Sequence, residues 1–297
     1  MLSFSRILNM ARSRKPRPVA VSDGAGASVI KALKKATDEG MCVPHLVGDS
    51  DKIIALAKDA GLREYEIIHC TDPVETAKTA VSLVKNGTCS LLMKGKSDTK
   101  TLMQAVLDRE KGLRTGNRMS HVAAVEVPLL QKVFFITDGG INPHPDLELK
   151  KMILANAVTA AIALGIKKPK AAVLCAQEAV KNDQPETLDA VALVEHFNNG
   201  GFPGLDFLEG PMATDVALSR RAATIKGIES SVSGCADILL VPDLASGNIM
   251  AKSILYLVPD RIFGGVVMGA SCPIILLSRA DEETEKYHSI SLACAMV

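Results

Sequence analysis

Tryptophan is absent from the 297-residue sequence, and aromatic residues make up only 3% of it. Aliphatic side chains therefore supply most of the core, since hydrophobic residues still reach 47%. A core of this kind favours helices stacked on a largely parallel sheet over a β-sandwich. The length exceeds that of a usual compact domain and suits two packed α/β lobes.

An excess of charge of either sign is also missing. With 34 basic and 33 acidic residues, the formal net charge is +1. That balance offers no basic field for nucleic acid. No apolar run approaches the ~18 residues of a membrane-spanning helix. We therefore predict no nucleic-acid partner and no membrane partner.

The seven cysteines form no CxxC pair and are odd in number. This predicts reduced thiols in a cytoplasmic protein rather than a disulfide framework or a zinc site. Residues 1–18 carry five basic residues and no acidic one, which fits either an organellar transit peptide or a short amphipathic helix. We favour the helix, because a folded pattern begins directly after it.

Short apolar runs alternate with stretches of helical spacing along the chain. The predicted strands cover 18–22, 43–47, 66–69, 89–93, 120–126, 132–137, 171–175, 205–209, 238–241 and 274–277. The predicted helices include 28–37, 145–164, 186–198, 212–222 and 247–257. The runs at 120–126 and 132–137 leave no room for a helix between them, so they predict a hairpin or an antiparallel edge. The rest predicts an α/β fold with largely parallel sheets and helices on both faces, in which ligands bind beyond the carboxyl ends of strands.

Two glycine-bearing motifs are incomplete. The stretch DGAGASV begins like a dinucleotide loop, but Val29 occupies the third glycine position, so a Rossmann cofactor site is disfavoured. The stretch SLLMKGKSD ends like a phosphate loop, but Ser90 stands where the first glycine belongs. It is either a solvated basic turn or an anion site built from Lys94, Lys96, Lys100 and the following helix N-terminus.

Neither a metal site nor a covalent serine is indicated. The six histidines lack metal-ligand spacing, and no GxSxG elbow occurs. The pair Ser120 and His121 is of interest, because it opens a predicted strand. We predict no metal and no cofactor.

Three predicted strand ends carry polar groups of complementary kinds. They present Gly139 and Gly140 in TDGGINPHPD, Asn248 and Lys252 in VPDLASGNIMAK, and Ser278 and Arg279 in LLSRADEETEK. Backbone amides, a side-chain amide, an ammonium group, a hydroxyl and a guanidinium together suit a phosphate or phosphoryl group. The alternative for any single loop is ordinary capping, with Ser278 as the N-cap of a helix that begins near Ala280.

The sequence resembles the phosphate acyltransferase family over nearly its whole length. The resemblance rests on LLMKGKSDTKTLMQAVLDREKGLRTGNRMSHVA, FITDGGINPHPDLELKKMILANAV, FLEGPMATDVALS, VPDLASGNIMAKS and GASCPIILLSRADEETEKYHSI. It implies two α/β lobes of the isocitrate/isopropylmalate dehydrogenase type and a homodimer. The first lobe would comprise 1–144 and 268–297 and the second 145–267, with the active site in the cleft between them.

The resemblance also implies a reaction in which a short-chain acyl-CoA and phosphate give acyl phosphate and CoA. Coenzyme A is then a substrate, and the small-molecule partners are acyl-CoA and phosphate. The segments GLRTGNRMSHVA and SRADEETEK are closer to the butyryl than to the acetyl branch, which favours a C3–C5 acyl group. The alternatives are a phosphate acetyltransferase, a cofactor-dependent oxidoreductase of the same fold, and a non-catalytic CoA-binding protein.

The family motif places catalytic groups at Ser278, Arg279 and Glu285, with Glu285 as the base for the CoA thiol. The residues expected to bind phosphate or acyl phosphate are Asn248, Lys252, Gly139, Gly140, Ser120 and Lys100. The chain departs from the family pattern at Ala251, which replaces a tyrosine, and at Met103, which replaces an arginine of the acetyl branch.

Overall fold

The computed structural model describes residues 1–278 and 280–297. The chain forms two compact units: unit 1 comprises 1–3 and 118–261, and unit 2 comprises 4–117 and 262–297. The sequence-based boundaries at 144/145 and 267/268 differ from these. The reason for the first difference is that the strand at 133–137 pairs in parallel with the strand at 238–240, which ties both to unit 1.

Unit 2 is built on a mostly parallel run of strands. In spatial order these are β3 (Glu66–His69), β2 (Cys42–Gly48), β1 (Arg17–Ser22), β4 (Leu91–Lys94), β11 (Ile274–Ile275) and β10 (Ile262–Met268). Neighbouring strands are parallel except β10 and β11, which are antiparallel. The carboxyl ends of β1 and β4 therefore lie side by side.

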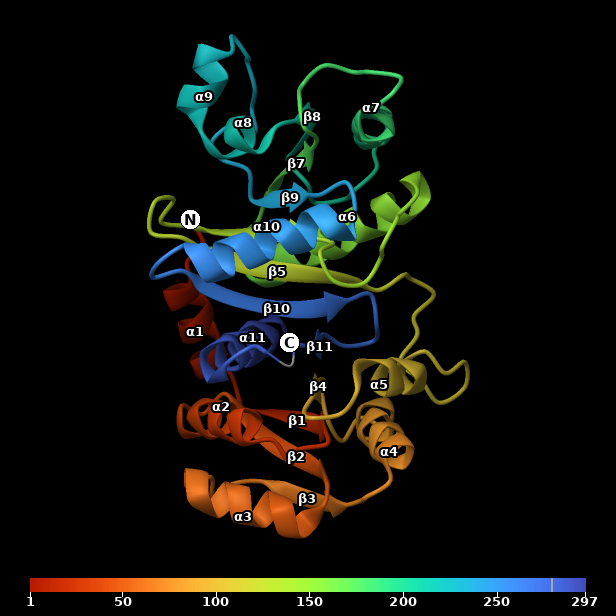
Figure 1. Ribbon diagram of the computed structural model, residues 1–297, viewed down its shortest axis with the longest axis vertical. Coiled ribbons are helices and arrows are strands. Elements are labelled where there is room, and N and C mark those ends of the chain that lie inside the picture. Colours follow the sequence, from red (N-terminus) through yellow and green to blue (C-terminus); the bar gives the residue numbers. More distant parts are fainter. Residues whose placement is uncertain (279) are drawn as a thin grey trace. The chain divides into compact units, whose positions relative to one another are not determined.

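Helices cover both faces of these strands (Figure 1). On one side lie α1 (Phe4–Ser13), α2 (Ala27–Asp38), α3 (Ser50–Ala60) and α11 (Glu283–Met296), and on the other lie α4 (Pro73–Lys85) and α5 (Thr99–Val106). The first helix buries Phe4, Ile7 and Ala11 along one face, as expected for the amphipathic helix predicted near the N-terminus.

Unit 1 has a second set of strands, in the order β5 (Ser120–Glu126), β6 (Val133–Thr137), β9 (Ile238–Leu240), β7 (Lys170–Leu174) and β8 (Phe207–Met212). The predicted antiparallel pairing of β5 and β6 is confirmed, and the other neighbours are parallel. The helices are α6 (Leu147–Ala163), α7 (Pro185–Asn198), α8 (Thr214–Leu218), α9 (Arg220–Ile225) and α10 (Leu244–Leu257). The predicted α/β class with largely parallel strands is therefore confirmed.

One predicted helix is wrong. Residues 212–222 do not form a single helix, because Met212 ends β8 and the chain then turns between α8 and α9. At that turn the Ser219 hydroxyl accepts a hydrogen bond from the Ala222 amide at 3.2 Å and caps the second helix.

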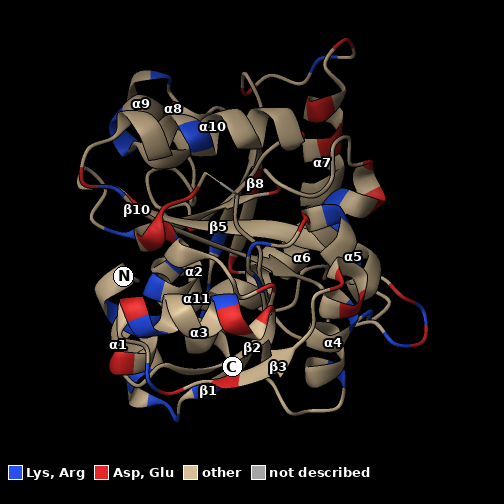
Figure 2. Ribbon diagram, turned by 60° about the horizontal axis from the view of Figure 1, so that its bottom comes forward, with Lys and Arg blue, Asp and Glu red and all other residues tan. Residues whose placement is uncertain are grey.

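Charges of both signs are interspersed over the helices and loops of each unit (Figure 2). None of the helices in the described part of the chain is both long and apolar enough to cross a bilayer.

Candidate functional site

The loops that follow β1 and β4 are joined by backbone hydrogen bonds. Ser22 and Lys94 are neighbours in the strand register. Beyond them the Gly95 amide donates to the Ser22 carbonyl at 2.9 Å, and the Lys96 amide donates to the Asp23 carbonyl at 2.8 Å. A Cβ on Gly95 would lie 2.1 Å from the Asp23 carbonyl oxygen, so only glycine allows the two loops to come this close. The two incomplete glycine motifs thus meet at one edge of the strands.

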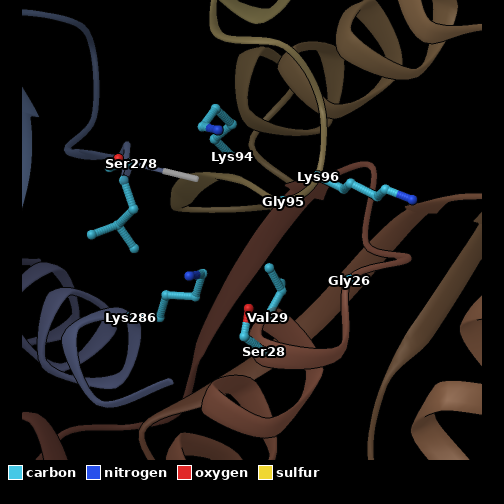
Figure 3. A pocket seen from close by; sticks show the side chains of 9 residues that line it. Gly26, Ser28, Val29, Lys94, Gly95, Lys96, Ser278 and Lys286 are labelled. Atoms are coloured by element: carbon cyan, nitrogen blue, oxygen red, sulfur yellow. The ribbon is translucent and has the colours of Figure 1, made fainter. Parts of the chain in front are cut away.

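A pocket of about 310 Å³ lies beside these joined loops (Figure 3). It is lined by Gly26, Ser28, Val29, Lys94, Gly95, Lys96, Leu277, Ser278 and Lys286. None of the described residues in this lining is acidic. The pocket is therefore suited to an anion rather than to a cation.

The amino end of α2 contributes backbone amides to this pocket. The helix begins at Ala27. Its N-cap is Gly26, which has no side chain to accept hydrogen bonds from the first amides. The first amides of a helix have no partner within the helix, and the helix dipole makes this end attractive to negative charge. Ser28 adds a hydroxyl in the first turn, directed toward the pocket in Figure 3.

Two of the three lining lysines are buried. Lys94 is 7% exposed and Lys286 is 5% exposed, whereas Lys96 extends away from the pocket in Figure 3. The Lys94 Nζ donates to the Ser97 carbonyl at 3.4 Å, and the Lys286 Nζ donates to the Asp281 carbonyl. Burial lowers the pKa of the Lys286 ammonium group, although neighbouring carboxylates oppose the shift. Two ammonium groups are thus held close to the pocket with little water around them.

Ser278 reaches the same pocket, but it is not a helix cap. The helix α11 begins at Glu283 rather than near Ala280, and its N-cap is Glu282. Ser278 instead lies in the preceding loop, where its amide donates to Asp281 Oδ2 at 2.8 Å. The alternative in which Ser278 is the N-cap is therefore wrong. The prediction for Arg279 concerns a residue outside the described ones.

Glu285 occupies the third position of α11 and is 8% exposed. Its Oε2 accepts a hydrogen bond from the Glu282 amide at 3.1 Å, and the Glu282 side chain caps the Glu285 amide in return. This reciprocal capping box stabilises the start of the helix. Glu285 is not among the described residues that line the pocket. Its role as a base stays a prediction, and its capping role is an observation.

In unit 1, the loop after β6 is organised around the buried carboxylate of Asp138, which is 2% exposed. Its Oδ1 accepts from the amides of His121, Gly140 and Ile141 at 3.1, 2.9 and 3.1 Å. Its Oδ2 accepts from the amide and the side-chain nitrogen of Asn142 at 3.1 and 2.6 Å. A carboxylate with several amide donors holds a loop in one conformation. Asp138 is not among the predicted site residues, although it stands directly before the glycine pair.

The loop after β6 also contacts the start of α10. A Cβ on Gly139 would lie 2.8 Å from the backbone carbon of Gly247, and Asn248 Nδ2 donates to the Gly139 carbonyl at 3.1 Å. Lys252 follows one turn later on α10 and is half-buried. Within unit 1 the structure therefore joins Gly139 to Asn248, with Lys252 farther along α10, while the Gly140 amide is already engaged by Asp138.

Two further predicted residues lie in unlike settings. Ser120 is fully buried, and its hydroxyl accepts a hydrogen bond from Asn156 Nδ2 at 2.9 Å. Lys100 is exposed in the first turn of α5 and does not line the pocket beside Lys94. Across the described residues, no group of three or more His, Cys, Asp or Glu side chains could hold a metal ion.

The family model described as phosphate acetyl/butaryl transferase matches residues 71–294. The chain belongs to this family. A phosphate butyryltransferase of Clostridium acetobutylicum is 39% identical over 98% of the chain and 97% of its own length. A phosphate acetyltransferase of Rhizobium meliloti is 38% identical over 98% of the chain and 92% of its own length. The predicted family is therefore confirmed, and the chain is an enzyme.

Solved structures agree with this assignment. A branched-chain phosphotransacylase from Enterococcus faecalis V583 is 30% identical, with a TM-score of 0.84 over 94% of this chain and 98% of that one. A 4-hydroxythreonine-4-phosphate dehydrogenase from Klebsiella pneumoniae is only 12% identical, with a TM-score of 0.59. The second likeness concerns the fold alone, and it agrees with the predicted dehydrogenase-like architecture.

Proposed function

We propose that the enzyme transfers a short acyl group between coenzyme A and phosphate, with a C3–C5 group such as butyryl favoured over acetyl. The observation that carries the proposal is the pocket beside Ser278, which is lined by lysines and by no acidic residue among those described. Support for the acyl group comes from relatives named phosphate butyryltransferase, which match nearly the full chain at 39% identity. Relatives named phosphate acetyltransferase match at similar identity, so acetyl-CoA is the main competing substrate.

The proposed chemistry is direct transfer without an acyl-enzyme. A phosphate oxygen attacks the thioester carbonyl, the carbon–oxygen bond forms, and the carbon–sulfur bond breaks to release the CoA thiolate. In the reverse direction the thiolate attacks the acyl phosphate carbonyl and phosphate leaves. A CoA thiol with a pKa of about 8.5 is mostly protonated near neutral pH, so a base that accepts its proton accelerates this direction.

We assign that base to Glu285, the phosphate contact to Arg279, and hydrogen-bond donation to the reacting oxygen atoms to Ser278. Ser278 is supported by its exposed hydroxyl at the lysine-lined pocket. A guanidinium binds a tetrahedral anion through charge-assisted hydrogen bonds. The assignment of Glu285 requires its carboxylate to serve both the capping box and the thiol.

In unit 1, Asn248, Lys252 and Gly139 are proposed to bind phosphate or acyl phosphate, as is the neighbouring Gly140. Ser120 is proposed to contribute to the same site from a buried position, where its hydroxyl accepts a hydrogen bond from Asn156. Lys100 is proposed to attract anionic substrates from the surface of α5, where it is exposed.

We also propose that the enzyme is a cytoplasmic homodimer. Ile249, Tyr256 and Leu257 are 66%, 66% and 77% exposed on α10, and such an apolar helix face is often covered by a second copy. Light scattering coupled to size exclusion tests this, and a mass of one chain at micromolar concentration would contradict it.

The test of the function is free-thiol release from acetyl-, propionyl-, butyryl- and isobutyryl-CoA in the presence of phosphate. We expect kcat/KM to be higher for butyryl-CoA than for acetyl-CoA. A higher kcat/KM for acetyl-CoA would show that acetyl, rather than butyryl, is the preferred acyl group. Heat of CoA binding without product would favour the non-catalytic binder, and turnover only with nicotinamide and a divalent metal would favour the oxidoreductase.

A further inference from the structure

Two other hollows of unit 2 have linings that differ from that of the pocket beside Ser278. The hollow along α4 and α5, of about 710 Å³, combines Lys78 and Lys111 with the acidic Glu75, Asp108 and Glu110. The hollow of about 480 Å³ beside α2 and α3 also mixes lysines with Asp38, Glu39, Asp59 and Glu283. A lining that contains lysines and no acidic residue among those described therefore distinguishes the pocket beside Ser278 from these two hollows.

The positions of Lys94 and Lys286 are costly for a protein that needs only a stable fold. Burying an ammonium group removes most of its hydration, and lysines are rarely as buried as these two. The Nζ atoms of both donate hydrogen bonds to backbone carbonyls, and carboxylates lie near the Lys286 ammonium group. Buried charged groups that lower stability are often functional, because they can bind a ligand of opposite charge strongly.

The donors at the pocket come from separate parts of unit 2. Lys94 ends β4, Lys286 lies in the first turns of α11, and the N-terminus of α2 adds backbone amides beside Ser28. Lys94 pairs with Ser22 at the end of β1, and β1 leads into α2. Met93 pairs with Ile275 of β11, and β11 precedes α11. The strand register therefore brings these segments together. A phosphate group accepts hydrogen bonds through several oxygens, and this arrangement presents donors from different directions.

We propose that this pocket binds a phosphate group of one of the substrates, and that Lys94 and Lys286 are the residues that hold it. The inference rests on the proposed acyl transfer and names two binding residues for it. The phosphate group belongs either to inorganic phosphate and acyl phosphate or to CoA itself. A volume of about 310 Å³ lies at the lower end of ligand pockets, which leaves room for a phosphate group and the atoms attached to it.

The test compares Lys94→Met and Lys286→Met with the wild type. Methionine keeps most of the side-chain volume and removes the charge. Lys58→Met is the matched control, because Lys58 is exposed on α3 of the same unit and does not line the pocket. Dissociation constants are measured for inorganic phosphate by ³¹P NMR titration, and for CoA and dephospho-CoA by calorimetry.

We expect each pocket variant to weaken binding of a phosphate-bearing ligand by at least about tenfold, which corresponds to about 1.4 kcal/mol. The control should bind as the wild type does. Weaker binding of inorganic phosphate alone identifies the reacting phosphate. Weaker binding of CoA with unchanged binding of dephospho-CoA identifies its 3′-phosphate, and weaker binding of both CoA forms identifies its diphosphate.

Thermal unfolding without ligand separates binding from a structural role. Methionine removes the hydrogen bonds to the Ser97 and Asp281 carbonyls and, at position 286, the attraction of nearby carboxylates. A loss of Tm is therefore compatible with ligand binding when the same variant also binds the ligand more weakly. A lower Tm together with unchanged binding of all three ligands would overturn the proposal. That outcome differs from failure of the proposed function, in which the wild type itself releases no thiol from acyl-CoA and phosphate.

Discussion

Units 1 and 2 both place glycine-bearing loops beyond the carboxyl ends of their strands, but they use the polar groups there differently. In unit 1 the loop amides donate hydrogen bonds to the Asp138 carboxylate. In unit 2 the loops are joined to each other, and lysines and a helix N-terminus face a pocket. The difference indicates that the unit 1 loop is a platform fixed by the Asp138 carboxylate, whereas the unit 2 pocket presents lysines and no acidic residue among those described.

The largest expected effect comes from removing the centre of the unit 1 platform. Asp138→Ala deletes the acceptor of five hydrogen bonds, and hydrogen bonds to charged groups contribute about 1.5–3 kcal/mol each without being additive. We expect the free energy of unfolding to fall by about 3–4 kcal/mol. Denaturant titration measures this, and a loss below about 1 kcal/mol would show that solvent replaces the carboxylate.

The next prediction concerns Glu285, whose carboxylate lies at the start of α11. Glutamine can replace glutamate in a capping box, so Glu285→Gln should leave stability nearly unchanged. If Glu285 is the base, the rate of acyl phosphate with CoA should fall by about 10² or more, and the loss should shrink at high pH as the thiol ionises by itself. Ser278→Ala should instead lower the rate at every pH.

The competing assignment is Asp281, which lies four residues before Glu285. If the rate below pH 7 stays near normal in Glu285→Gln but falls in Asp281→Asn, the base is Asp281 rather than Glu285. The paired variants thus separate a capping role from a catalytic role on the same helix.

A smaller effect is expected where the unit 1 loop meets α10. Gly139→Ala would place a methyl group 2.8 Å from the Gly247 backbone, which cannot move aside easily, and we expect a loss of about 1–3 kcal/mol. Gly140→Ala is the matched control, because its methyl group would meet the His121 side chain at 3.1 Å. Equal stability of the two variants in a denaturant titration would show that the close approach is not tight.

The smallest predicted effect is a pH dependence arising in α11. Burial lowers the pKa of His288 to about 4, with a further contribution from Lys35 that Glu285 opposes. The unfolded chain takes up this proton below about pH 6.5, while the folded chain does so only near pH 4. Stability therefore falls as the pH drops, by about 1–2 kcal/mol between pH 7 and 5. Unfolding of His288→Leu should show this loss reduced, and an unchanged loss would contradict the assignment.

Most strands and the long helices follow from apolar periodicity, but β10 was missed for a definable reason. The stretch IFGGVVM contains adjacent glycines, which are unfavourable in a strand interior. Here a Cβ on Gly264 would lie 3.0 Å from the His288 backbone, and the Gly265 amide donates to the Ser289 hydroxyl at 2.9 Å. Glycine lets α11 pack directly on β10, which is a tertiary requirement that local periodicity does not encode.

In the candidate site, too, some residues could be selected from the local sequence and others only from the tertiary structure. Asn248 and Gly139 could be selected from their loops, and the structure joins them. Lys286 could not, because a lysine within EETEKY has the pattern of a solvated helix face, and its burial depends on how α11 packs. The start of α11 was placed too early because Ser278 fits a cap as well as Glu282 does, and only the reciprocal bond with Glu285 decides between them.

The phosphate dependence of butyryl-CoA cleavage by the wild-type enzyme tests the proposed acyl transfer most directly. Thiol release is followed while inorganic phosphate is varied from zero, and acyl phosphate is trapped with hydroxylamine and counted. Direct acyl transfer to phosphate predicts negligible release without phosphate, saturation as phosphate rises, and equal moles of thiol and acyl phosphate. Release at the same rate without phosphate, with no acyl phosphate formed, would contradict it.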